Sequence, residues 1–178
     1  ALEALREYDQ YHRYPDPTSR RLIESISRYV DVPQAHILAG NGSDELISLL
    51  LALFRPGRDG GGIAEVIDCP PTFGMYSFYA SANDMHVLQV PRRPDFALDI
   101  DGIEALCRRD PRPRVVFVAS PNNPDGLLLP EDTLQRLLAL PLLVVLDEAY
   151  IEFSGSSRAR WVPEYRNLIV LRTFSKWA

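Results

Sequence analysis

Two short apolar runs, VVFVA at residues 115–119 and LLVVL at residues 142–146, constrain the fold of this chain more than any other feature. Neither run alternates apolar with polar residues, as a strand with one solvent-facing side does. Uninterrupted runs of this kind are typical of strands that are covered on both faces, as in a parallel sheet between two layers of helices.

Other short runs with strand character alternate with segments of helical periodicity. This rhythm predicts βαβ units and a mainly parallel sheet, so the predicted fold class is α/β with three αβα layers. The expected strands are 63–68, 86–90, 115–119, 142–146 and 168–171. The expected helices are 20–30, 46–54, 73–80, 103–109 and 131–140.

Composition narrows the class of protein further. The chain has 178 residues, 46% of them apolar, and a net charge of −5, which argues against nucleic acid or an anionic membrane as a partner. Cys69 and Cys107 form neither a disulfide framework nor a zinc motif, so we expect no metal site and a reducing, cytoplasmic compartment. The sequence shows no signal peptide or membrane span, and the GRDGGG segment at 57–62 is expected to be a flexible connection.

Ligands of open parallel sheets bind beyond the carboxyl ends of the strands, so the residues after each apolar run are candidates for a site. LLVVL is followed by DEAY, and LIVLR is followed by TFSK. A carboxylate at a buried strand end needs a partner. For Asp147, that partner could be a protonated nitrogen heterocycle, or the carboxylate could cap a helix. Lys176 could be an ordinary solvated group or a desolvated nucleophile that forms a Schiff base.

Two loops offer further polar groups. GNGSDE at 40–45 leads into a helix, whose first amides suit a phosphate, although Asn41 or Ser43 could simply cap that helix. The loop matches neither GxGxxG nor GxxxxGK[ST], which disfavours a dinucleotide-binding dehydrogenase and a P-loop NTPase. In SPNNPDG at 120–126, Asn122 and Asn123 could point an amide into the site or bond their own turn.

Together these signals fit one cofactor. Pyridoxal 5′-phosphate needs a lysine for its aldehyde, an acid for its ring nitrogen, donors for its phenolic oxygen and an anion site for its phosphate.

The sequence also resembles a known family. It is similar to the fold-type I pyridoxal-phosphate enzymes, to the class-II-like aminotransferases among them, and most of all to the histidinol-phosphate aminotransferases. The stretches that carry the resemblance span almost the whole chain: RYPDP (13–17), HILAGNGSDELI (36–47), DCPPTFGMY (68–76), SPNNPDG (120–126), LDEAYIEF (146–153) and TFSK (173–176).

The resemblance implies roles for the catalytic residues. Lys176 is expected to form the Schiff base with the cofactor and then to move the substrate proton. Asp147 is expected to hold the proton on the ring nitrogen. Asn123 and Tyr150 are expected to hydrogen-bond the phenolic oxygen.

The resemblance also implies the surroundings of the cofactor. Phe73 is expected to stack on its ring, and Tyr14 is expected to reach the phosphate bound by the other subunit of a homodimer. The phosphate is expected to lie among Gly42, Ser43, Asp44 and Thr173.

The function implied by the resemblance is transamination of L-histidinol phosphate with 2-oxoglutarate, or glutamate in reverse, in histidine biosynthesis. Three alternatives stay open: an aromatic aminotransferase, an amino-acid-phosphate decarboxylase of the same fold, and a non-catalytic remnant that only dimerises or binds cofactor weakly. Asp125 stands where the family usually has threonine, a mild departure at a turn.

The resemblance finally implies a domain organisation. Residues 1–30 are expected to form an N-terminal arm and helix, and residues 31–178 an incomplete cofactor-binding large domain. The small C-terminal domain of the family is absent from these residues, so the 178-residue chain is expected to be a fragment that is inactive by itself.

Overall fold

The structure is a computed structural model that describes residues 2–55, 65–112 and 114–176. These residues form two compact units, 1–39 and 40–178. The first unit contains α1 (Leu2–Glu7), α2 (Arg20–Val30) and the short helix η1 (Gln34–His36). The helix predicted at 20–30 is confirmed, whereas α1 was not predicted within its polar and aromatic surroundings. The expected domain boundary after Val30 stays a prediction.

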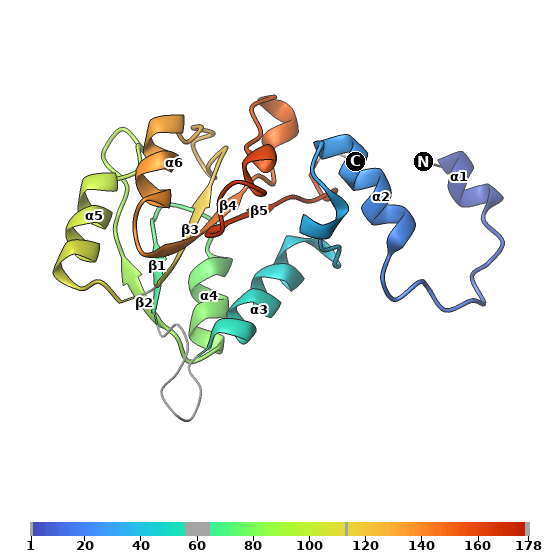
Figure 1. Cartoon of the computed structure of the whole chain (residues 1–178), viewed down its shortest axis with the longest axis horizontal. Coiled ribbons are helices and arrows are strands. Elements are labelled where there is room, and N and C mark those ends of the chain that lie inside the picture. Colours follow the sequence, from blue (N-terminus) through green and yellow to red (C-terminus); the bar gives the residue numbers. More distant parts are fainter. Residues whose placement is uncertain (1, 56–64, 113, 177–178) are drawn as a thin grey trace. The chain divides into compact units, whose positions relative to one another are not determined.

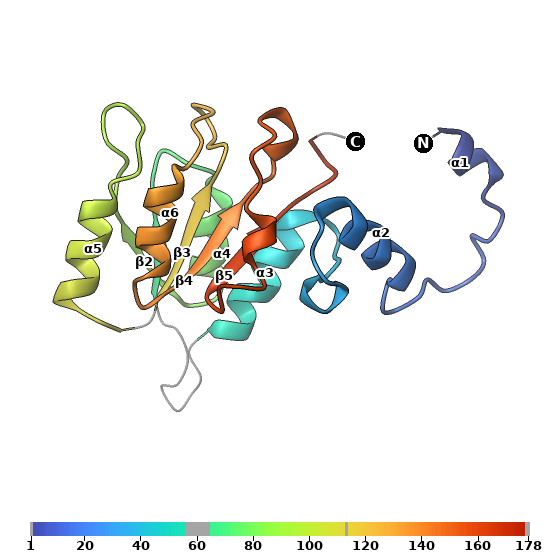
Figure 2. The same cartoon turned by 45° about the horizontal axis from the view of Figure 1, so that its top comes forward.

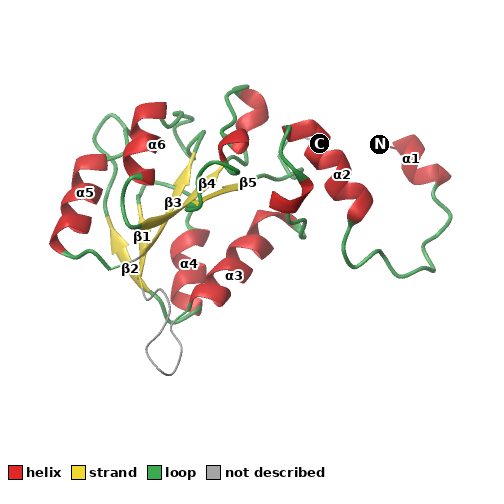
Figure 3. Cartoon of the chain, in the orientation of Figure 1, coloured by secondary structure: helices red, strands yellow, loops and turns green. Residues whose placement is uncertain are grey.

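The second unit contains the sheet (Figures 1 and 3). Its strands are β1 (Glu65–Asp68), β2 (His86–Gln89), β3 (Arg114–Ala119), β4 (Leu142–Asp147) and β5 (Leu168–Leu171). All five strands are parallel, in the order β2-β1-β3-β4-β5. Every predicted strand is present, although residues 63 and 64 of the first lie outside the described part of the chain.

Helices cover both faces of this sheet (Figure 2). They are α3 (Gly42–Phe54), α4 (Met75–Ala82), α5 (Ile100–Arg109) and α6 (Glu131–Leu138), followed by the short helices η2 (Ile151–Phe153) and η3 (Ala159–Trp161). The α/β class with three layers is therefore confirmed. The predicted helices shift at their ends: α3 begins at Gly42, in the glycine loop, and α5 begins at Ile100 because the Asp99 side chain caps it by accepting from the Gly102 amide.

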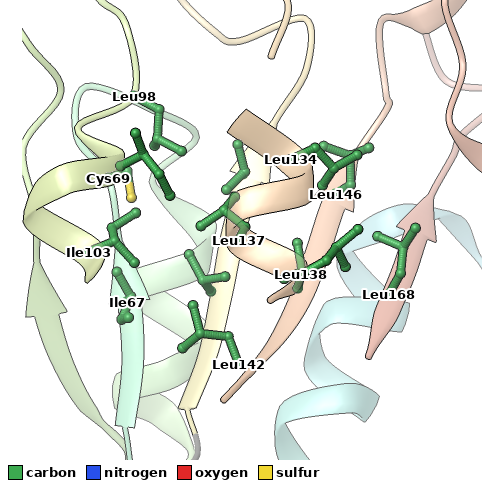
Figure 4. Packing of buried hydrophobic residues seen from close by; sticks show 14 of the residues in the cluster. Ile67, Cys69, Leu98, Ile103, Leu134, Leu137, Leu138, Leu142, Leu146 and Leu168 are labelled. Atoms are coloured by element: carbon green, nitrogen blue, oxygen red, sulfur yellow. The ribbon is translucent and has the colours of Figure 1, made fainter. Parts of the chain in front are cut away.

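The strands divide their side chains between two cores. Val116 and Leu146 pack with α5 and α6, as Figure 4 shows for the leucines of α6 above the sheet. Phe117 and Val145 face the other way and pack with α3 and α4. Adjacent residues of one strand thus enter different cores, which explains why these strands have no polar face.

A buried ion pair joins the first residues of β1 and β3. The Arg114 guanidinium is 1% exposed; its Nε donates to Glu65 Oε2 at 2.6 Å and its Nη2 lies 2.9 Å from Asp110 Oδ2. The exposed Arg112 also reaches Glu65 Oε1, at 3.2 Å. These contacts fix the register of the two strands at the amino edge of the sheet.

We expect Arg114→Met to lower the free energy of unfolding by about 3 kcal/mol, because it leaves the Glu65 carboxylate buried with only partial compensation from Arg112. Arg93→Met is the matched control. Its partners Asp99 and Asp101 lie at the surface, so its loss should cost less than about 1 kcal/mol. Urea denaturation measures both values, and equal losses in the two variants would contradict the assignment.

Candidate functional site

A cavity of about 210 Å³ lies at the carboxyl edge of the sheet. The chain order β2-β1-β3 reverses direction at β1, and ligands of open parallel sheets bind at such a reversal. All predicted site residues except Tyr14 line this cavity: Gly42, Ser43, Asp44, Phe73, Asn123, Asp147, Tyr150, Thr173 and Lys176. Its other lining residues are Asn41, Tyr76, Ala119, Pro121, Ala149 and Ser175. Tyr14 belongs to the first compact unit and its role stays a prediction.

Asp147 is the last residue of β4 and is 4% exposed. Its Oδ2 accepts a hydrogen bond from the Tyr76 hydroxyl at 2.6 Å, and its Oδ1 accepts from the Ala149 amide at 3.0 Å. Burial raises the pKa of Asp147 above its ordinary value, and these hydrogen bonds offset only part of that rise. A cationic ligand group in the cavity would stabilise the carboxylate.

Tyr76 also lines the cavity and contacts Asp147, but it was not among the site residues predicted from the sequence. Its side chain is fully buried in α4, its ring stacks on Phe117 at 4.8 Å between centroids, and it meets Phe73 edge-on at 5.5 Å. The signal that the sequence offers is its position three residues after Phe73 in FGMY, a spacing that places two residues on one face of a predicted helix. The contact with Asp147, 71 residues away, depends on how α4 packs on the sheet.

The N-terminus of α3 forms one wall of the cavity. Asn41 is the N-cap residue, but its side chain makes no capping hydrogen bond. Gly42 has a φ of +84°, a left-handed conformation that favours glycine. The 13-residue helix therefore presents its first amides and the positive end of its dipole toward the cavity.

Two acids in the first turn of α3 would repel an anion, but they do not point the same way. The Glu45 carboxylate folds back and accepts from the Asn41 backbone amide at 2.5 Å and from its side-chain amide at 3.2 Å. These hydrogen bonds lower the pKa of Glu45. Asp44 is exposed and lines the cavity, so of these two acids it is the one at the cavity surface.

The structure separates the two candidate asparagines after β3. Asn122 is 3% exposed and ties loops together: its Nδ2 donates to the Pro71 carbonyl at 3.2 Å and to Asp125, and its Oδ1 accepts from Thr72 Oγ1 at 3.0 Å. Asn123 lines the cavity instead. Asp125 also accepts from the Leu127 amide at 2.8 Å, so the residue that departs from the family pattern stabilises the turn.

Lys176 follows β5 and lies beside Tyr150. Its Nζ is 5.7 Å from the centroid of the Tyr150 ring, and its side chain is exposed at the cavity. The Thr173 hydroxyl accepts from the Ser175 amide at 3.2 Å and shapes the turn that carries the lysine. Lys176 is also the only lysine in the sequence, since every other residue counted as Lys or Arg is arginine.

A second buried acid, Glu148, follows Asp147 in the chain but does not line the cavity. Glu148 is fully buried and accepts from Ser157 Oγ and from the Arg158 amide, each at 2.6 Å. Glu152 pairs with Arg172, the residue before Thr173. These contacts tie the segment after β4 to the strand that leads to Lys176.

Among the described residues, no group of three or more His, Cys, Asp or Glu side chains is arranged to hold a metal ion. In the same parts of the chain, no helix has the length and apolar character needed to cross a membrane.

The fold and the cavity define a class of protein: a three-layer α/β protein whose sheet edge gathers an amine, a buried carboxylate and the N-terminus of a helix. Comparison with known families identifies the class more closely. The family described as "Aminotransferase class I and II" matches residues 1–177, and the chain belongs to this family. Pyridoxal 5′-phosphate, the cofactor expected from the sequence, is the cofactor of this family.

Individual relatives are named more specifically. The chain is 49% identical to histidinol-phosphate aminotransferase 1, chloroplastic, of Arabidopsis thaliana, over 99% of this chain and 41% of that protein. It is 48% identical to histidinol-phosphate aminotransferase of Thermococcus gammatolerans, over 98% of this chain and 48% of that protein. The chain thus spans somewhat less than half the length of these relatives.

A solved structure gives the same result. The histidinol-phosphate aminotransferase of Sinorhizobium meliloti, in complex with pyridoxal 5′-phosphate, superposes with a TM-score of 0.82 at 28% identity. The superposition covers 98% of this chain and 48% of that one.

The cost of burying Asp147 predicts how stability depends on pH. Its pKa is raised in the folded protein, so the folded state holds the proton more tightly than the unfolded state, and the free energy of unfolding falls as pH rises above about 4. Asp147→Asn removes this loss. In the absence of cofactor, the variant should therefore have a higher melting temperature than the parent protein at pH 7. The difference should be about 2–4 °C for each kcal/mol of destabilisation that the substitution removes, and it should become smaller toward pH 4.

Asp125→Asn is the control with the opposite sign. Burial acts to raise the pKa of Asp125, but hydrogen bonds from Leu127 and Asn122 hold it below its ordinary value. This carboxylate stabilises the fold above its unfolded pKa, so its loss should lower the melting temperature at pH 7. Calorimetry from about pH 4 to pH 8 measures both variants. An Asp147→Asn protein that melts below the parent at pH 7 would contradict the prediction.

Proposed function

We propose that the chain carries the cofactor site of an aminotransferase that moves the amino group of L-histidinol phosphate to 2-oxoglutarate in histidine biosynthesis. The observation that carries the proposal is one cavity lined by the Lys176 amine, the buried Asp147 carboxylate and the N-terminus of α3. The names of the relatives that are 48% and 49% identical to the chain support this choice of substrate.

The residues present fit the needs of pyridoxal 5′-phosphate. When bound, this cofactor supplies an aldehyde that reacts with amines and a protonated ring that withdraws electrons from the substrate. Asp147 gains a cationic partner for a carboxylate that burial destabilises. The uncapped first turn of α3 suits the phosphate, and Phe73 supplies an aromatic face at the cavity wall.

The chain's own groups then divide the work. Lys176 Nζ is the amine that would hold the cofactor through its aldehyde, and it would carry the proton at the substrate α-carbon. The Asp147 carboxylate would hold the proton on the ring nitrogen. Asn123 and Tyr150 would donate to the phenolic oxygen, and Gly42, Ser43, Asp44 and Thr173 would hold the phosphate.

We propose a homodimer as the assembly. Apolar side chains that would normally be buried are exposed on two contacting helices: Leu49 and Leu53 on α3 are 55% and 77% exposed, and Phe78 on α4 is 60% exposed. Tyr14 is 99% exposed, which leaves its hydroxyl available to the phosphate site of a second copy.

Location and organisation complete the proposal. A cytoplasmic location is consistent with two cysteines that are buried and unpaired in the described structure, although the Arabidopsis relative is named chloroplastic. Residues 31–178 act as the cofactor-binding domain, and residues 1–30 as its N-terminal arm.

Borohydride trapping tests the cofactor site. Because Lys176 is the only lysine, reduction of the protein with bound pyridoxal 5′-phosphate should attach one phosphopyridoxyl group to the peptide that contains residue 176. Lys176→Arg keeps the positive charge but cannot form the bond, so the label should disappear from that peptide. Peptide mass spectrometry measures both; a label confined to the N-terminal amine of the parent protein would refute the site.

Turnover tests the substrate. The comparison should use the 178-residue chain and a chimera that continues it with the C-terminal part of the Thermococcus relative. The chimera should transaminate histidinol phosphate at least tenfold faster, by kcat/KM, than phenylalanine, and should not decarboxylate threonine phosphate. Preference for phenylalanine would favour an aromatic aminotransferase, and release of CO₂ would favour a decarboxylase. A chimera that binds cofactor without turnover would favour a non-catalytic remnant.

A double-variant comparison tests the dimer and Tyr14 together. Leu53→Glu with Phe78→Glu should convert the dimer into a monomer by sedimentation, because both charges would be buried at the interface. Tyr14→Phe should weaken cofactor binding about tenfold in the dimer by removing a hydrogen bond to phosphate. In the monomeric background, Tyr14→Phe should cause no further loss.

The matched control is Leu127→Glu, which changes an apolar loop residue that is 43% exposed. This variant should sediment as a dimer, as the parent protein does. If Tyr14→Phe weakens binding in the monomer as well, Tyr14 acts within its own chain.

A further inference from the structure

We propose that the Tyr76 hydroxyl is a positioning group for the cofactor: by donating to Asp147 it keeps that carboxylate ionised and directed at the ring nitrogen. This inference rests on the proposed function and gives a role to a residue that the sequence motifs did not single out. It is carried by the hydrogen bond between Tyr76 and Asp147 and by the packing that fixes it.

The position of the hydroxyl is fixed by the ring that bears it. The Tyr76 ring stacks on Phe117 with an interplanar angle of 13° and meets Phe73 edge-on, and its side chain is fully buried. Phe117 belongs to β3, the strand that pairs with β4 and places Ala119 beside Asp147. The phenol therefore has no freedom to turn away from the carboxylate.

The two oxygens of Asp147 each receive one donor from the protein. Tyr76 donates to Oδ2 at 2.6 Å, and the Ala149 amide donates to Oδ1 at 3.0 Å. This arrangement fixes the plane of the carboxylate. A carboxylate oxygen can accept more than one hydrogen bond, so acceptor capacity remains for a ligand in the cavity that Asp147 lines.

Neighbouring charges act on this pair from several elements. Around Asp147, the Asp44 charge on α3 raises its pKa and the Lys176 charge after β5 lowers it. Around Tyr76, burial together with the charges of Asp147 and Asp68 raises its pKa well above the ordinary value, while Arg92 lowers it. Tyr76 therefore stays protonated at every working pH and remains a donor.

A permanent donor on Oδ2 lowers the proton affinity of Asp147. This matters because the carboxylate and the ring nitrogen of a bound cofactor would share one proton. With the hydroxyl present, that proton would stay on the nitrogen. Without it, burial would dominate the carboxylate, and the shared proton would move toward Asp147.

Tyr76→Phe tests this idea by removing one oxygen atom and keeping the ring. The first measurement is the carboxyl ¹³C titration of Asp147 in cofactor-free protein, assigned by comparison with Asp147→Asn. The second is the ¹⁵N signal of the ring nitrogen in ¹⁵N-labelled pyridoxal 5′-phosphate bound to the protein. Tyr79→Phe, the same change on the same helix, is the control.

We expect Tyr76→Phe to raise the titration midpoint of Asp147 and to move the ¹⁵N signal toward that of a neutral pyridine, while Tyr79→Phe changes neither. In the active chimera, kcat should fall about 10- to 100-fold with little change in KM, as loss of a hydrogen bond to a charged group predicts. A purely structural Tyr76 would lower the melting temperature but leave both spectroscopic signals in place, and that result overturns the inference.

If Tyr76→Phe does not fold, difluorotyrosine at position 76 provides a stronger donor and should lower the midpoint; an unchanged or higher midpoint overturns the inference. The same experiments distinguish failure of this inference from failure of the proposed function. A protein that traps no cofactor at Lys176 refutes the aminotransferase site, whereas the ¹³C titration still tests the contact between Tyr76 and Asp147.

Discussion

The buried carboxylate of Asp147 is the constraint on which the rest of the site depends. A charge at a strand end inside a protein is costly unless its oxygens are paired. Two donors meet part of that need, from Tyr76 and from the backbone of Ala149, yet the pKa of Asp147 stays raised. The fold therefore holds an acid that is stabilised most by a cationic group entering the cavity.

Strand register decides which acid takes this place. Ala119, Asp147 and Leu171 form one row across β3, β4 and β5, and two backbone hydrogen bonds continue that row: Ser120 to Asp147 and Glu148 to Leu171. Because side chains alternate between faces, Asp147 meets Tyr76 while Glu148 meets the segment that contains Ser157. A slip of one residue would exchange the two acids, so the pairing of the central strands is itself part of the site.

The sequence allowed the strands and most of the cavity to be predicted for a physical reason. Uninterrupted apolar runs mark buried parallel strands, and polar residues after them must gather at one edge because the strands share a direction. The residues by themselves left the choice between Asn122 and Asn123 open, and only the family resemblance favoured Asn123. Both lie in one turn, and packing of the loop against Pro71 and Thr72 separates them. The role of Tyr76 could not be predicted for a similar reason. An aromatic residue on a helix is usually a core residue, and Tyr76 is one, but its hydroxyl also donates to Asp147.

The two edges of the sheet use charge in different ways. At the amino edge, the buried Arg114 is matched by Glu65 and Asp110, and the fixed fork of a guanidinium suits such permanent pairs. Near the carboxyl edge, Arg172 pairs with Glu152 in the same manner.

An arginine cannot act as an amine nucleophile, because it keeps its proton at any working pH. The chain assigns arginine to every other cationic position and keeps its single lysine at the cavity, beside Tyr150. Among the side chains, only Lys176 can therefore bond an aldehyde as an amine, and the turn shaped by Thr173 holds it at the cavity that Asp147 also lines.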